Sequence, residues 1–174
     1  MGDCVMASST GSVVVESPVT QLHSPYCSAT IYEDRVEYRF HHADKNAVDA
    51  FIDLLDQVLL LRYPDGVYTG TVRLLYDVRV PEVLPFYWLF SRALEWRKNH
   101  PGYAPCEVRM AVLFGPQHRF HDSMFLRMVQ QFSPLFSRNG HRFGLFEDDY
   151  EAALEWLHGE VAPDHLRDAF LRSF

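Results

Sequence analysis

The residues Thr71–Arg97 have the sequence TVRLLYDVRVPEVLPFYWLFSRALEWR, in which an apolar run, a polar break and an aromatic-rich segment follow one another. The apolar run Val72–Tyr76 predicts a buried strand, and Val83–Asn99 predicts a helix that covers the sheet. Asp77 comes directly after the strand. In an open α/β sheet, ligands and partners bind at the carboxyl ends of the strands. The stretch therefore indicates a place for a functional site, but it contains no catalytic motif.

Predicted strands and helices alternate along the rest of the chain. A β-hairpin is predicted at Ala29–His41, and two further strands are predicted at Glu107–Phe114 and His141–Phe146. Segments with apolar residues at helical spacing lie between and after these strands. Strands that alternate with helices imply parallel strands with right-handed crossovers. We expect a single-domain α/β fold whose mixed, mostly parallel sheet has about five strands, starts with the β-hairpin and carries packed helices.

Acidic residues indicate where the predicted helices begin. Asp44 and Asp122 stand where an N-cap is expected, and the acidic residues 147–149 precede the last helix of the domain. Gly159 is the predicted C-cap of that helix. The predicted domain therefore spans residues 29–158.

Two segments flank this predicted domain. Residues 1–28 are polar and interrupted by prolines, and we expect them to form a flexible N-terminal arm. Residues 159–174 are expected to form an amphipathic helix, because three apolar residues recur at a spacing of one helical turn. These residues are Leu166, Phe170 and Phe174.

The composition limits the class of protein. The chain has 174 residues, of which 48% are hydrophobic, and a formal net charge of -7. These values support one sizeable core and argue against a nucleic-acid partner. No apolar run approaches the roughly 20 residues that a membrane span requires, and the N-terminus lacks the basic and apolar regions of a secretory signal. We therefore predict a cytoplasmic protein without an integral membrane segment.

Sequence motifs for metals, nucleotides and nucleophiles are missing. The cysteines Cys4, Cys27 and Cys106 are scattered, without disulfide or zinc-ligand spacing, and Cys106 is interpreted as a core residue. No glycine-rich phosphate loop is present. Several polar residues at predicted strand ends lack ligand spacing and are interpreted as solvated loop residues and caps: His41, His42, Asp77, Arg79, Gln117, His118, Glu147 and Asp148. The sequence predicts no metal, no cofactor and no catalytic residue.

The aromatic helix has more apolar surface than one sheet can cover. Four of its residues form a predicted buried stripe, namely Phe86, Leu89, Phe90 and Ala93. Four residues are left on other faces, namely Leu84, Tyr87, Trp88 and Trp96. A helix of this kind must cover something besides its own sheet. The N-terminal arm or the C-terminal helix is one candidate, and a homodimer face or a cleft for an apolar ligand is another.

Three segments resemble a known family. They are the hairpin ATIYEDRVEYRF before the first helix, the strand LLYDVR with Asp77 at its end, and the ending RFGLFEDDYEAALEWL. With the element order, they resemble the STAS domain of anti-sigma-factor antagonists and sulfate transporters over Ala29–His158. The resemblance implies a STAS-like fold. Antagonists of this family carry a phosphorylated Ser or Thr after this strand, but Asp77–Glu82 contains no hydroxyl residue, so that switch is not expected.

These observations predict a non-enzymatic regulatory or binding module that engages a protein partner or an apolar small molecule near residues 77–88. The candidate binding residues are Asp77, Arg79, Leu84, Tyr87, Trp88 and His118. One alternative is a small enzyme that uses His118, His121 or Asp77 in a crevice at the carboxyl ends of the strands. Another alternative is a homodimerising structural domain.

Overall fold

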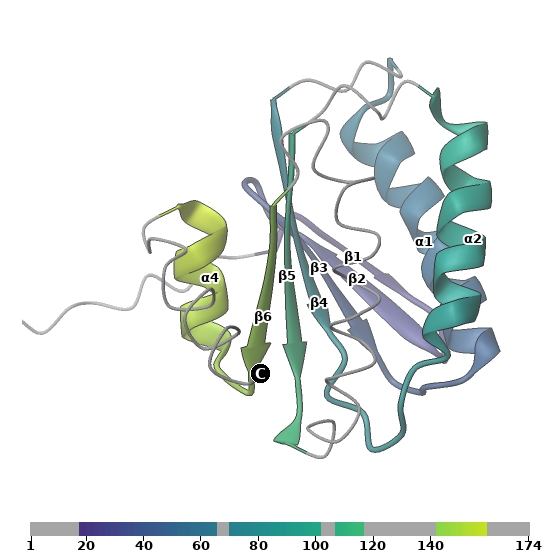
Figure 1. Ribbon diagram of the computed structural model, residues 1–174. Coiled ribbons are helices and arrows are strands. Elements are labelled where there is room, and N and C mark those ends of the chain that lie inside the picture. The colour runs from purple at the N-terminus through teal and green to yellow at the C-terminus, as the bar shows by residue number, and fades with distance from the viewer. Residues whose placement is uncertain (1–17, 66–69, 102–106, 117–141, 160–174) are drawn as a thin grey trace, which may run out of the picture.

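The computed structural model describes residues 18–65, 70–101, 107–116 and 142–159, which form a sheet with helices packed on it (Figure 1). The strands are β1 (Thr20–His23), β2 (Cys27–Ile31), β3 (Val36–Phe40), β4 (Thr71–Asp77), β5 (Glu107–Phe114) and β6 (Arg142–Glu147). The helices are α1 (Lys45–Arg62), α2 (Phe86–Asn99) and α4 (Tyr150–His158). The predicted α/β class is confirmed.

The strands lie in the sheet in chain order, β1-β2-β3-β4-β5-β6. The pairs β1-β2 and β2-β3 are antiparallel, and the pairs β3-β4, β4-β5 and β5-β6 are parallel. The predicted mixed sheet is therefore confirmed. The described sheet has six strands, so the expected number of about five is corrected. The additional strand β1 lies within the segment 1–28 that we expected to be a flexible arm.

Strand β1 depends on its neighbour more than on its own sequence. Its four residues, TQLH, include a single large apolar side chain, so local pattern does not predict a strand there. Leu22 pairs with Ala29 of β2 and packs against the main core. Tertiary pairing thus stabilises a segment of weak intrinsic preference.

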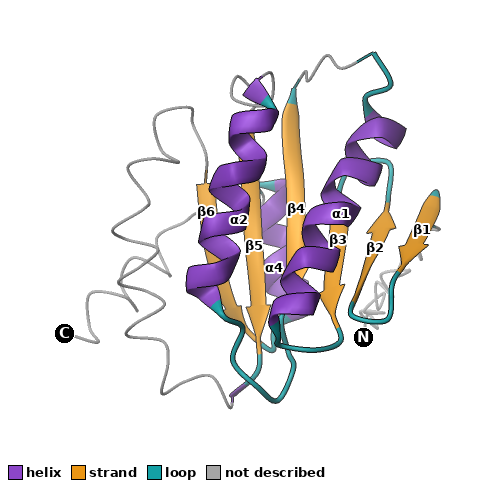
Figure 2. Cartoon of the chain, turned by 90° about the vertical axis from the view of Figure 1, so that its right-hand side faces the viewer, coloured by secondary structure: helices purple, strands orange, loops and turns teal. Residues whose placement is uncertain are grey.

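The sheet is covered on both faces. Helices α1 and α2 lie on one face and α4 lies on the other (Figures 1 and 2). Successive side chains of a strand point to opposite faces, so Leu74 of β4 enters the main core beneath α1 and Leu75 faces α4. A second, smaller core lies under α4 and contains Leu75, Ala111, Ala153, Trp156 and Leu157. Burial on both faces explains the two successive leucines in the middle of β4, TVRLLYD.

The predicted caps of α1 and α4 are confirmed. Asp44 accepts a hydrogen bond from the backbone N–H of Ala47 at 2.8 Å. Asp149 accepts one from the N–H of Ala152 at 3.0 Å. Gly159 ends α4 with a left-handed backbone, φ 78°. Short-range polar chemistry therefore sets the bounds of these helices.

Some expectations fall outside the described residues. They concern the arm up to residue 17, Cys106, the helix after Asp122 and the C-terminal helix beyond Gly159. Cys27 of β2 is buried, and burial raises the pKa of its thiol to about 12, so the thiol packs as a small neutral group. In the described ranges, no helix has the length and hydropathy needed to cross a membrane.

Gly159→Ala is expected to destabilise the chain more than Gly70→Ala. Both glycines have a positive φ, 78° and 79°, so alanine costs about 1–2 kcal/mol at either position. A Cβ at Gly159 would also lie 2.5 Å from Nη1 of Arg109, whereas a Cβ at Gly70 would meet no atom within 4 Å. Because Nη1 is the end of a flexible side chain, Arg109 can move aside, and in urea denaturation we expect only the further loss of its weak hydrogen bond to Leu157, about 0.5 kcal/mol. Equal losses in the two variants would contradict a tight contact with Arg109.

Candidate functional site

The carboxylate of Asp77, at the end of β4, is buried among arginine donors. Arg79 donates from Nε to Oδ1 and from Nη2 to Oδ2, each at 2.9 Å, and its backbone N–H donates to Oδ1 at 3.2 Å. Arg39 donates from Nε to Oδ2 at 3.1 Å. Burial acts to raise the pKa of Asp77, but the hydrogen bonds and charges of the two arginines outweigh it, and the pKa lies below the usual 3.8.

Arg79 also joins the loop after β4 to the turn between β6 and α4. Its Nη1 donates to Oδ1 of Asp148 at 2.7 Å. Asp148 has a left-handed backbone, φ 48°, and its N–H donates to the carbonyl of Phe114 at 2.9 Å. The hydrogen bonds to Asp77 and then to Asp148 raise the pKa of Arg79. Asp77, Arg79 and Asp148, which the sequence placed at strand ends, are therefore in one cluster.

Asp77 is a structural group in this cluster. Both of its oxygens accept hydrogen bonds from Arg79 or Arg39, so neither oxygen is left to remove a proton from a substrate. In the part of the chain that the structure describes, no group of three or more His, Cys, Asp or Glu side chains could hold a metal ion. The cluster instead fixes the path of the loop that follows β4.

The apolar candidates before and in α2 have different environments. Leu84 is 3% exposed and belongs to the main core, so the prediction that it lies on an outer face is wrong. The reason is that α2 begins at Phe86, so Leu84 lies in the preceding loop and helical spacing does not determine its direction. Tyr87, in the first turn of α2, is 86% exposed. His118 lies outside the described residues.

The two tryptophans of α2 face α1. Trp88 donates from Nε1 to Oδ1 of Asp49 at 3.3 Å, and Trp96 donates from Nε1 to Oδ1 of Asp56 at 2.6 Å. Nζ of Lys45 lies 4.9 Å from the centroid of the Trp88 ring. Helix α1 therefore covers part of Trp88, and Trp96 is buried, so the prediction that Trp96 lies on an outer face is wrong. The sequence does contain a signal for this contact. Trp88 and Trp96 are two helical turns apart, and so are their partners Asp49 and Asp56, but a search for apolar spacing does not detect such polar pairs.

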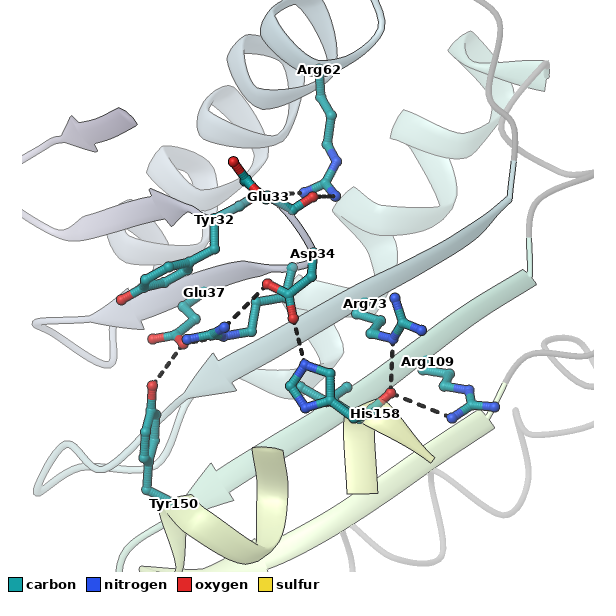
Figure 3. A network of polar contacts seen from close by, with 11 residues as sticks. Tyr32, Glu33, Asp34, Glu37, Arg62, Arg73, Arg109, Tyr150 and His158 are labelled. Carbon is teal, nitrogen blue, oxygen red and sulfur yellow. Dashed lines mark hydrogen bonds and ion pairs between the residues drawn. The ribbon is translucent and has the colours of Figure 1, made fainter. Parts of the chain in front are cut away.

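A second polar group ties α4 to the hairpin of β2 and β3 (Figure 3). The hydroxyl of Tyr150 donates to Oε1 of Glu37 at 2.7 Å, and Nε2 of His158 contacts Oδ2 of Asp34. Arg35 is 4% exposed and donates to both Glu37, at 2.7 Å, and Asp34, at 3.2 Å. Burial first, and then Glu37, raise the pKa of Tyr150, so its hydroxyl stays a donor. Both ends of α4 are thereby held to the hairpin.

The pH dependence of stability tests the Asp77 cluster. The folded pKa of Asp77 is lowered, so its contribution is complete above the usual pKa of 3.8 and is lost as the pH falls through the folded value. Asp77→Asn is expected to lower the free energy of unfolding by about 2 kcal/mol at neutral pH. It should also make the decline of stability in acid less steep.

Asp53→Asn is the matched control, because Asp53 is exposed on α1. It should leave the free energy of unfolding within about 0.5 kcal/mol of wild type. Chemical denaturation across the acid range measures both variants. An Asp77→Asn chain that loses stability in acid as steeply as wild type would show that Asp77 is not the titrating group.

Comparison of the chain with protein-family models, with curated proteins and with solved structures finds no match. The resemblance to STAS domains thus stays a prediction from the sequence.

Proposed function

We propose that the chain is a cytoplasmic, non-enzymatic binding module of the STAS-like kind that engages a protein partner at the carboxyl edge of its sheet. The contact surface consists of Tyr87 and the exposed residues Pro81 and Glu82 of the loop 78–85 that leads into α2. The observation that carries the proposal is the position of Tyr87. This residue is 86% exposed and follows a loop that an ion-pair cluster holds in place.

An exposed tyrosine is well suited to the centre of a protein contact. It offers a large aromatic surface with few rotatable bonds, and tyrosines are enriched among the residues that contribute most to interface affinity. Pro81 and Glu82 are exposed in the loop before it, and the side chain of Arg39 is 62% exposed at the end of β3. An aromatic centre with polar surroundings has the composition of a protein interface.

The loop before Tyr87 is ordered by contacts within the chain. Val78, Val80 and Leu84 are buried, and the backbone N–H of Val78 donates to a carbonyl of β5 at 2.8 Å. Arg79 adds its ion pair with Asp77. A surface that is ordered before binding loses less conformational entropy when the partner arrives, which favours affinity.

The same contacts favour a protein partner over the alternatives. A cleft for an apolar small molecule was expected to use Leu84 and Trp88, but Leu84 belongs to the core and Trp88 packs beside α1. An enzyme that used Asp77 would need a free carboxylate oxygen, and both oxygens accept from arginines. His118 and His121 lie outside the described residues, so they give the enzyme alternative no geometric support.

Site-specific photo-crosslinking tests this proposal. A benzophenone amino acid at Ser91, which is exposed one turn after Tyr87, is expected to give a discrete adduct with another protein in cells of the source organism. Adding Tyr87→Ala should remove that adduct, because truncation of a central interface residue weakens binding by about thirtyfold. The stability of the purified variant should stay within about 0.5 kcal/mol of wild type, since Tyr87 is exposed.

The same benzophenone at Gln57, an exposed position on α1, is the control and should not give this adduct. An identical adduct from both positions would contradict a specific contact at Tyr87. An adduct between two copies of this chain would show that the partner is a second copy, and the proposal would become a homodimer. An adduct that is still formed by the Tyr87→Ala variant would show that Tyr87 is not part of the contact.

A further inference from the structure

We draw no further inference here: the strongest candidate, the outer edge of strand β1 at Thr20–His23 beside the exposed side chain of Val19, carries none, because nothing in the described residues shows what covers it.

Discussion

The burial of β4 on both faces is the constraint on which the rest of the structure depends. Leu74 enters the core beneath α1 and Leu75 enters the core beneath α4, so a helix is needed on each side of the strand. Polar groups that face α4 are then excluded from the middle of β4. They appear toward its two ends, as Arg73 and Asp77. The positions of these polar side chains therefore follow from the burial of β4 by helices on both of its faces.

The sequence predicted those features that depend on neighbouring residues. Asp44 and Asp149 cap helices through N–H groups three residues away, and Gly159 ends α4 through its own backbone, so local pattern was sufficient. Strand β1 was missed because its stability comes from pairing with β2. Leu84 was misplaced because its direction depends on the path of a loop, which helical spacing does not describe.

The sequence predicted where the candidate surface lies, but it did not predict which contacts its side chains make. Asp77 was found from its position after an apolar run, but its partner Arg39 comes from another strand and no sequence pattern joins them. Trp88 was counted as apolar surface, although the indole N–H lets it pair with Asp49 of α1. Tyr87 is therefore the member of that aromatic group with the largest exposure. Hydrogen-bonding capacity, as well as hydrophobicity, decides which rings in such a helix are covered.

The order of strands has a consequence for how the chain is made. Each described strand pairs with the strands next to it along the chain. The three parallel pairs nevertheless join residues 33 to 38 positions apart, so each closes a longer loop than the hairpin of β2 and β3 does, and parallel pairing of this kind forms slowly. On the ribosome, the hairpin of β2 and β3 can pair with β4 while the later strands are still being synthesised, because no early strand has to wait for a distant one. Growth from one side also leaves a temporary open edge on β4, which β5 closes as soon as it emerges.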